Sequence, residues 1–492
     1  MVVVHVVLPV TLFRDERAYR EAGLVLVYED PRYFSEARFH KAKLVLHRAS
    51  MRAFYSSELR SARRKRYVEF HEVLELPGDC TAVRLHDPFD EPLLRRWERR
   101  LGALLQVLPS PNFLLTRAEA LALPRSMRFG SAFYPHMRRK LGLLVDGRGK
   151  PTGGRWSFDV ENRRRLPRGQ AVPARDAENR LAAVREARNY VETHFPDNPG
   201  SPRLYFPATR QQARRALRSF VEQSLPLFGA FQDAISNRSS RLLFHSGLAA
   251  SLNIGLLGDR EVLAAAVSAL QQGLAGIQSV EGFVRQVAGW RQYCLYIYLT
   301  RPEIRASSAL RHDRRLSRKW WDAATQMPPV DAVVRKVRES GYAHHIERLM
   351  VLGNFMLLCQ IDPRQVERWF LEFVAIDAYD VFMVPNVLGM SQFADGGVVM
   401  TRPYFSSSAY LQKMSEEPWT GTVDLPSGRY PWEQVWDAVY RHFVNRHRKL
   451  LRKNYGTASQ AAHWDRRRAA DPGWAAEQLR LAREYLSYIE AD

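Results

Sequence analysis

The chain has 492 residues, 46% of them hydrophobic and 11% aromatic, and a formal net charge of +21. This length and composition are typical of a globular protein of about two to four domains with a large core. No segment reaches the ~18 consecutive uncharged apolar residues of a transmembrane helix, so we predict no membrane span. The charge favours a polyanionic partner, DNA or RNA, bound through a basic surface, although a basic soluble enzyme is also compatible with it.

Three cysteines, Cys80, Cys294 and Cys359, lie far apart in the sequence. Their small and odd number indicates a reducing compartment and rules out a cysteine-rich metal site made by this chain alone. The apolar start "MVVVHVVLPV" has no basic leader or cleavage site and is interpreted as a first strand rather than a signal peptide. We expect a cytoplasmic or nuclear protein, or an organellar one if a transit peptide lies outside this numbering.

The first 110 residues alternate between short β-rich runs and helix-like segments. The helix-like segments are 50–62 and 91–102, and the β-rich runs are 2–10, 24–30, 43–49, 67–73, 82–88 and 104–110. Strands that alternate with helices predict a doubly wound parallel sheet, and we assign residues 1–130 to an α/β domain. No G-x-G-x-x-G motif follows the first run, so an ordinary dinucleotide site is not expected there.

The rest of the chain is predicted to be helical. Residues 131–205 are rich in Pro, Gly and Arg and are interpreted as an interdomain connector with some helices. From residue 206 to 492, apolar residues recur at spacings of three and four, for example in 281–299 and 330–358, which predicts an all-α domain. Basic runs such as "RRKR" at 63–66 are each interpreted as a solvated face.

Two adjacent histidines interrupt an otherwise apolar helix in "GYAHHIERLMVLGNF" (341–355). Neighbouring side chains on a helix diverge by about 100°, so His344 and His345 cannot occupy one ligand position. His345 and Arg348 are three residues apart and lie on neighbouring faces. No second ligand has suitable helical spacing, so no metal site is predicted. Two core histidines with satisfied hydrogen bonds are the alternative to a functional pair.

The helical half carries three further specific motifs, "HSGLAASLNIGLL" (245–257), "VEGFVRQVAGWRQYCLYIY" (280–298) and "PNVLGMSQFADGG" (385–397), and the connector carries a fourth, "GRWSFDVENR" (154–163). Together with the histidine segment they resemble the photolyase–cryptochrome superfamily, and within it the bacterial-type (6-4) photolyase branch, whose members usually carry an iron–sulfur cluster. The resemblance is weak in the first domain and specific in the second. It implies an α/β antenna-type domain followed by a helical FAD-binding domain.

The resemblance also implies a function. A blue-light-excited flavin would donate an electron to a pyrimidine photoproduct that is flipped out of DNA into a pocket over the cofactor. His345 matches a position at the interface of lesion and flavin, where an imidazole can exchange a proton, and His344 matches the neighbouring position, so both are candidate catalytic residues. Tyr404 and Tyr410 match aromatic positions around the lesion pocket.

Six positions match those that the family places at the flavin: Ser246, Leu248, Arg291, Arg348, Asp377 and Met383. Ser246 and Leu248 belong to the loop that would cradle the pyrophosphate. Arg348 would pair with Asp377 beside the isoalloxazine ring and stabilise an anionic flavin. Met383 stands where the family has Asn, Asp or Glu facing N5, in an alignment that can slip by one residue, and methionine cannot make the hydrogen bond of an amide or carboxylate.

Three aromatic residues match the electron-transfer positions of this branch: Trp321, Trp369 and Tyr379. Phe370 stands where a tyrosine is usual. Buried tryptophans are also ordinary packing residues, which is the alternative for all three.

Two further family features are missing from the sequence. The four cysteines that would ligate a [4Fe–4S] cluster align with Pro329, Pro418, Gly421 and the region of Tyr430, so no cluster is expected. The loop that would contact the antenna chromophore reads "LPVTLF" at 8–13 instead of Gly-Asp-Gln-Leu, so no antenna is expected.

Two hypotheses follow. The first is an FAD-dependent photolyase or cryptochrome-like flavoprotein that acts on DNA pyrimidine photoproducts. The second is a degenerate member of the fold that serves as a nucleic-acid-binding or scaffold component of a ribonucleoprotein assembly. The second predicts a cavity filled by Met383 among others. Light sensing without repair is a third possibility.

Overall fold

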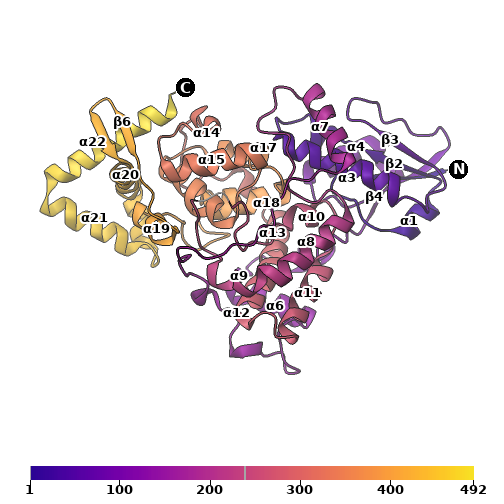
Figure 1. Cartoon of the computed structure of the whole chain (residues 1–492), viewed down its shortest axis with the longest axis horizontal. Helices are drawn as coiled ribbons and strands as arrows, with labels where there is room; N and C mark the ends of the chain where they lie inside the picture. Colours follow the sequence, from indigo (N-terminus) through magenta and orange to yellow (C-terminus); the bar gives the residue numbers. More distant parts are fainter. Residues whose placement is uncertain (1, 238–239, 492) are drawn as a thin grey trace.

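The computed structural model describes residues 2–237 and 240–491 of the chain. An α/β part carries the N-terminus at the right of Figure 1, and helices form the middle. A lobe at the left contains α20 (Trp432–Lys453), α21 (Ala458–Ala470) and α22 (Pro472–Glu490). No helix in the described part of the chain is long and apolar enough to cross a membrane.

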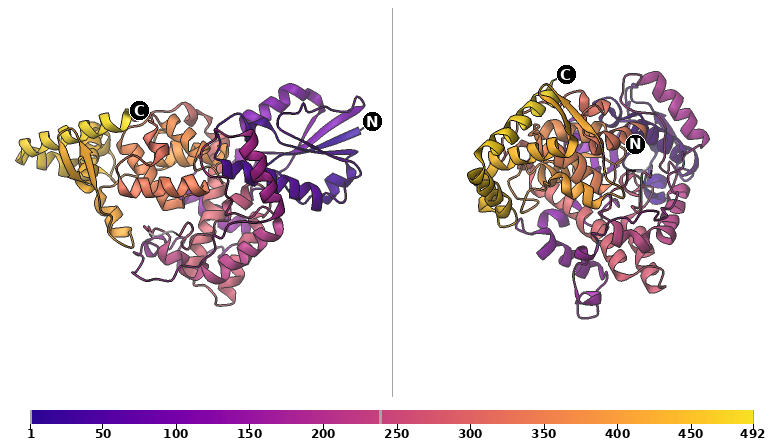
Figure 2. Two further views of the ribbon diagram at one scale, coloured as in Figure 1. Left: turned by 45° about the horizontal axis from the view of Figure 1, so that its top comes forward. Right: turned by 60° about the vertical axis from the view of Figure 1, so that its left-hand side comes forward.

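Five parallel strands form one sheet in the order β3-β2-β1-β4-β5. They are β1 (Val2–Val7), β2 (Leu24–Tyr28), β3 (Lys65–Val68), β4 (Cys80–His86) and β5 (Leu105–Leu108). Val4 of the central strand pairs with Leu24 on one side and Val83 on the other. It is fully buried, as expected for a parallel strand covered on both faces. Helices lie on both faces of the sheet (Figure 2), so the predicted doubly wound arrangement is confirmed.

One of the six β-rich runs is a helix. The helices of this part are α1 (Glu16–Glu21), α2 (Pro31–Phe34), α3 (Lys41–Ser57), α4 (Glu91–Leu101), η1 (Gly102–Leu104) and α5 (Arg117–Ala122). The predicted strand at 43–49 is wrong, because these residues lie inside α3. All of them are buried, including Lys43, His47 and Arg48. A short run buried on every side has no amphipathic periodicity, so a strand and a helix cannot be distinguished from it.

The segment between the two predicted domains contributes to both of them. It holds η2 (Phe129–Phe133), α6 (Tyr134–Leu141), η3 (Thr152–Gly154), η4 (Asp159–Glu161) and α7 (Ala182–His194). α7 packs along α3 of the α/β part, whereas α6 packs against η5 (Arg285–Trp290) of the helical part. The long stretches between these helices run over the surface as irregular chain.

The second half is helical, as predicted. Its remaining helices are α8 (Arg210–Gln223), α9 (Leu225–Phe231), α10 (Ala249–Asn253), α11 (Asp259–Gln271), α12 (Ile277–Val284), α13 (Arg291–Thr300), η6 (Pro302–Ala306), α14 (Lys319–Asp322), α15 (Pro328–Ser340), η7 (Glu347–Gly353), α16 (Asn354–Leu358), α17 (Pro363–Glu372), α18 (Asp380–Met383), η8 (Val384–Ser391) and α19 (Ser408–Met414). Large aromatic side chains fill their core, and Trp320, Trp369 and Trp436 are almost completely buried.

The helical half also contains a small antiparallel hairpin of β6 (Thr422–Leu425) and β7 (Gly428–Pro431). Gly421 enters it with φ of +147°, and a Cβ atom there would lie 2.7 Å from Cγ of Pro328. Trp432 donates from Nε1 to the Trp419 carbonyl at 3.2 Å and is fully buried. Strands of four residues give too short a pattern to be recognised in sequence.

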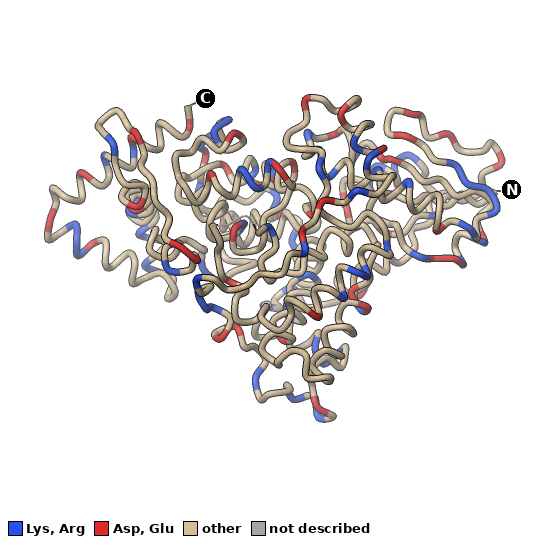
Figure 3. Tube along the Cα trace, viewed as in Figure 1, with Lys and Arg blue, Asp and Glu red and all other residues tan. Residues whose placement is uncertain are grey.

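Lysine and arginine residues are distributed over all parts of the molecule (Figure 3). Many of the arginines form ion pairs. Arg48, for example, lies 3.0 Å from both Glu29 and Glu69. A large part of the positive charge is therefore balanced by neighbouring carboxylates, and the net positive charge is carried by side chains outside such pairs.

Candidate functional site

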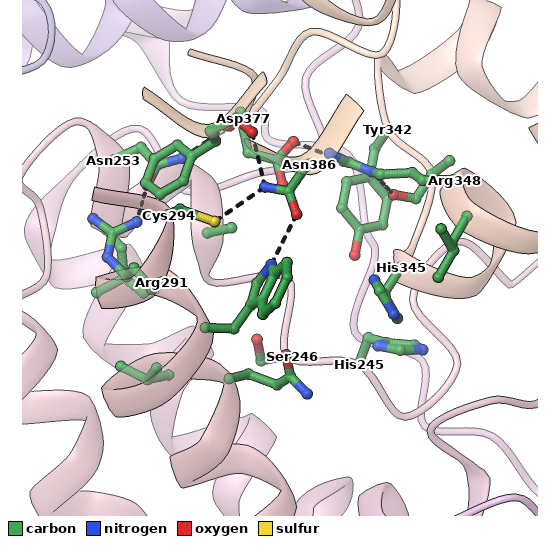
Figure 4. A pocket seen from close by; sticks show the side chains of 18 of the residues that line it. His245, Ser246, Asn253, Arg291, Cys294, Tyr342, His345, Arg348, Asp377 and Asn386 are labelled. Atoms are coloured by element: carbon green, nitrogen blue, oxygen red, sulfur yellow. Dashed lines mark hydrogen bonds and ion pairs between the residues drawn. The ribbon is translucent and has the colours of Figure 1, made fainter. Parts of the chain in front are cut away.

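A cavity of about 280 Å³ lies among the helices of the second half (Figure 4). We call it the inner cavity. Three π-helical segments, η5, η7 and η8, each contribute to its wall, through Trp290, Arg348 and Asn386 respectively. A π-helical turn inserts an extra residue into a helix and redirects its side chains, and such turns are frequent at functional sites.

An ion pair lies on one side of the inner cavity. Arg348 Nη2 is 2.7 Å from Asp377 Oδ1, and Arg348 Nε donates to the Ala343 carbonyl at 2.5 Å. The guanidinium also lies 5.3 Å from the ring centre of Tyr342. The sequence-based pairing of Arg348 with Asp377 is therefore present, and both residues line the cavity.

Asn386 was not found from the sequence, although it lies one helical turn after Met383. Both residues line the inner cavity. Asn386 accepts a hydrogen bond from Trp290 Nε1 at 2.8 Å and donates to Cys294 Sγ at 3.4 Å and to the Phe382 carbonyl at 2.9 Å. Burial raises the pKa of the Cys294 thiol to about 12, so it is a neutral hydrogen-bond partner. An amide therefore faces the cavity close to the methionine.

Arg291 lines the opposite side and is held firmly. It lies 3.0 Å from Asp259 and donates to Asn253, which also lines the cavity. The guanidinium is stacked between Phe113 and Phe382, 4.6 and 4.9 Å from their ring centres. This packing keeps a buried cation at the cavity wall.

The two adjacent histidines occupy different environments. His345 lines the inner cavity and is exposed to it, whereas His344 is buried and lines no described cavity. His344 stacks on His245, with ring centres 4.6 Å apart, and its Nε2 is 3.3 Å from Glu347 Oε1. Only His345 is placed for contact with a ligand. His245, which lines the inner cavity in front of His344, was not found from the sequence.

A second, larger space of about 500 Å³ adjoins the first, and we call it the outer cavity. The two share His345, Gln232 and Trp290 in their walls. Tyr404 and Tyr410, the two tyrosines predicted to surround a lesion, both line the outer cavity. His345 therefore lies at the boundary between the two spaces. Although it is open to the cavities, the surrounding protein lowers its pKa to about 4, with Arg348 and Arg285 adding to this effect, so the imidazole is neutral at pH 7.

Two carboxylates in the outer cavity were missed by the sequence reasoning. Burial raises the pKa of Asp233 to about 6, and the neighbouring Asp159 contributes to the shift. Asp159 is paired with Arg285 at 3.0 Å and with Arg163 at 2.5 Å. Asp233 is therefore a group that exchanges a proton close to neutral pH in the cavity that His345 also lines.

The loop at 245–248, which was predicted to hold the pyrophosphate, lies only partly at the cavity. Ser246 and Gly247 line the inner cavity, whereas Leu248 is 1% exposed and packs into the core. Gly247 has φ of +67°, and a Cβ atom there would lie 3.0 Å from Leu242 Cδ2, so a side chain would be strained. The loop thus brings backbone and a hydroxyl, but not the leucine, to the cavity.

Trp321 and Trp369 form an aromatic path to the inner cavity. Their ring centres are 6.1 Å apart, and the ring of Phe370, which lines the cavity, is 5.2 Å from Trp369. Tyr379 lies elsewhere. It does not line the inner cavity, and its hydroxyl is 2.8 Å from His47 Nε2 of the α/β part.

The inner cavity fits a flavin dinucleotide. It has aromatic walls, two arginines, a carboxylate and an amide. Gln232 Oε1 and His245 Nε2 line it and have no hydrogen-bond partner within the described chain. Buried polar atoms without a partner are rare in folded proteins and indicate a missing ligand or water. The alternative of a filled cavity is not supported, because Met383 lines an open space.

Comparison with known proteins agrees with this fit. The family model described as "FAD binding domain of DNA photolyase" matches residues 283–415, and the model described as "Deoxyribodipyrimidine photo-lyase-related protein" matches residues 5–205. The chain belongs to the photolyase–cryptochrome superfamily. The part that matches the FAD-binding model contributes Arg348, Asp377 and Asn386 to the inner cavity.

Individual members of the superfamily support the same assignment. A (6-4) photolyase of Agrobacterium fabrum is 41% identical over 342 residues, which are 68% of this chain and 66% of that protein. The Synechocystis sp. PCC6803 cryptochrome structure has a TM-score of 0.57 at 14% identity, covering 84% of this chain and 88% of that one. A bacterial class III photolyase structure from Agrobacterium tumefaciens has a TM-score of 0.51 at 15% identity, covering 79% and 80%. The chain thus spans just under two thirds of the first relative, and the two structures establish the photolyase fold.

No group of three or more His, Cys, Asp or Glu side chains in residues 2–237 and 240–491 could hold a metal ion. The positions that the photolyase resemblance gives to cluster cysteines lie around the hairpin and at the start of α15. Pro329 is buried in α15, and Gly421 fits closely against Pro328. This region is packed by side chains, with Trp419 and Trp432 buried.

Proposed function

We propose that this protein binds FAD in the inner cavity and repairs a pyrimidine photoproduct of DNA in blue light. The observation that carries the proposal is the position of His345 at the boundary of the two cavities. A cofactor in the inner cavity and a flipped-out lesion in the outer cavity would meet at this side chain. The similarity to a (6-4) photolyase supports the same class of substrate.

When bound, FAD supplies light-driven electron transfer, which the protein's side chains lack. Arg348 would hold the negative charge of the reduced cofactor, with Asp377 fixing the orientation of the guanidinium. Arg291 would contribute a second cation, held in place by Asp259. Asn386 would present its amide to the cofactor. This amide would replace the hydrogen-bonding side chain that the family has at the position of Met383.

The residues of the outer cavity would handle the lesion and its proton. His345, neutral at pH 7, accepts a proton on an imidazole nitrogen. Asp233, with a pKa of about 6, holds a proton on its carboxyl group in a fraction of molecules at pH 7 and can return it. Tyr404 and Tyr410 provide aromatic surface and hydroxyl groups for a flipped base. His344 orders the wall by stacking on His245 and does not touch the substrate.

We further propose that electrons reach the inner cavity through Trp321, Trp369 and Phe370, and that Tyr379 lies outside this route. The protein would work without an iron–sulfur cluster, since Pro329, Gly421 and their neighbours supply no thiolate. We also propose that it works without an antenna chromophore. The 8–13 loop is buried, and Leu12 donates from its backbone to Ile254 of the helical half at 3.0 Å.

The proposal is tested by the spectrum and composition of the purified protein. We expect the blue absorption of a flavin at about one flavin per chain, released as FAD on denaturation, and no iron or acid-labile sulfide. A colourless protein that does not take up added FAD would contradict the proposal. Iron and sulfide in stoichiometric amounts would contradict the cluster-free part alone.

A further inference from the structure

Tyr455 stands out on the surface of the molecule. Among the large apolar side chains that the described chain leaves exposed, it is the only aromatic one, with a relative exposure of 102%. It follows the last residues of α20 and precedes α21, in the sequence "RKNYGTAS" (452–459). An aromatic ring exposed to this degree buries no surface on folding and is fully accessible to a partner.

The turn that carries Tyr455 is held in one conformation. Asn454 Oδ1 accepts from the Gly456 backbone at 3.0 Å, and Asn454 Nδ2 donates to the Thr401 carbonyl at 2.5 Å. Thr457 Oγ1 donates to the Leu451 carbonyl at 3.0 Å and is buried. The exposed ring is therefore presented by a fixed backbone on both sides.

The turn lies at the rim of the outer cavity. Gly456 and Thr457 line this cavity together with Arg402 and Tyr404. Arg402 lies against the turn, because a Cβ atom on Gly456 would be 2.8 Å from its Cδ. Tyr455 is thus the residue that immediately precedes the rim of the cavity, in a turn against which Arg402 packs.

The surroundings of the ring match a nucleic acid. Arg402 and Lys453 are exposed, and among residues 2–237 and 240–491 neither has a carboxylate within ion-pair distance. The Arg402 guanidinium lies 5.9 Å from the ring centre of Tyr404, so both cations remain available for phosphate groups. Aromatic side chains stack on bases irrespective of sequence, because every base has a π-face. An exposed ring in a turn that also carries Lys453 and packs against Arg402, at the rim of the outer cavity, fits a strand whose backbone crosses the rim.

We infer that Tyr455 stacks on the DNA base face that is uncovered when a nucleotide leaves the duplex and enters the outer cavity. This inference rests on the proposed function, since it needs a nucleotide in that cavity. Extrusion of a nucleotide breaks the stacking on its neighbours, which is a main part of its cost. A ring held ready at the rim replaces part of this stacking and favours the extruded state. Arg402 and Lys453 hold the adjacent phosphates.

The test compares three variants on two DNA duplexes, one with a single (6-4) photoproduct and one undamaged, by fluorescence anisotropy in the dark. Tyr455→Ala should weaken binding of the damaged duplex by about tenfold. Tyr455→Phe keeps the ring and should bind within about twofold of the wild type. Leu121→Ala, which shortens an exposed side chain on α5, is the matched control and should change nothing.

Salt dependence separates stacking from phosphate contacts. Tyr455→Ala should leave the slope of log Kd against log salt unchanged, whereas Arg402→Gln should reduce it by about one. A damaged duplex that binds Tyr455→Ala as tightly as the wild type, while the wild type prefers damage, overturns this inference and leaves the proposed function intact. A wild-type protein without preference for damage overturns both.

Discussion

Arg348 Nη2 and Asp377 Oδ1 lie 2.7 Å apart and join η7 to the segment before α18 at the wall of the inner cavity. Their side chains are 21% and 10% exposed, so the pair is screened from most of the solvent but open to a ligand. A cation fixed in this way can receive the negative charge of a cofactor without moving. This relationship connects the stability of the helical half to the proposed cofactor.

Arg348→Ala should lower both flavin retention and stability. Asp377 loses its cation and stays largely buried, which costs about 2 kcal/mol of unfolding free energy, below the ~3–5 kcal/mol of a fully buried pair because part of Arg348 is exposed. Denaturant unfolding and the flavin content after dialysis measure the two effects. Arg305→Ala is the control, since Arg305 pairs with Asp380 outside the inner cavity and its loss should leave flavin content unchanged.

The two histidines should respond differently to substitution. His345→Ala should abolish repair but retain flavin and stability, because its side chain faces the cavities. His344→Ala should instead lower the unfolding free energy by about 1–3 kcal/mol, because it removes the stack on His245. Repair assays and denaturant unfolding of both variants check this. Equal effects of the two variants on repair and on stability would refute the separate roles.

Asp233 should give repair a pH dependence. Its carboxyl is protonated below a pKa of about 6, so the protonated fraction falls as pH rises through 6, and the repair rate should fall with it. The stability contribution has the same sign. Because the folded-state pKa lies above the ordinary 3.8, this contribution is present below 3.8 and is lost as pH rises through 6. Asp233→Asn should therefore be more stable than the wild type at pH 8. The repair rate of this variant should not fall as pH rises through 6. A wild-type limb near pH 6 that persists in the variant would assign the titration to another group.

Photoreduction should depend on the aromatic path. Trp369→Phe and Trp321→Phe should both strongly slow the light-driven reduction of bound flavin by an external thiol, because each removes an oxidisable ring from the path. Trp320→Phe is the matched control. Trp320 is adjacent in sequence but packs against Phe355, at 5.9 Å between ring centres, and is absent from the inner cavity wall. Normal photoreduction in the Trp369 and Trp321 variants would leave these residues with a packing role.

Much of the fold could be predicted from the sequence. The alternation of strands with helices, and apolar residues that recur every three or four positions, are both local signals. The strand predicted at 43–49 was wrong because this part of α3 is buried on every side and has no polar face to reveal the helical period. The pairing of Arg348 with Asp377 could be predicted because the motifs around both residues resemble those of a known family.

The other parts of the site depend on contacts between distant segments. Asp233 and His345 line the same outer cavity although they are more than a hundred residues apart, and no sequence motif links them. Asn386 lies within a motif, but its hydrogen bonds with Trp290 and Cys294 join helices almost a hundred residues apart. His344 stacks on His245 instead of lining the cavity. The sequence places His344 next to His345 but gives no sign of this contact with His245.

The central claim is that the two joined cavities carry out light-driven repair. The most direct measurement is the recovery of intact thymines in a defined oligonucleotide with one (6-4) photoproduct, incubated with the reduced, FAD-loaded protein in blue light and in darkness. We expect recovery in light only, for the wild type and not for His345→Ala. Equal amounts of unrepaired lesion in light and darkness, with FAD bound and the oligonucleotide bound, would contradict the claim.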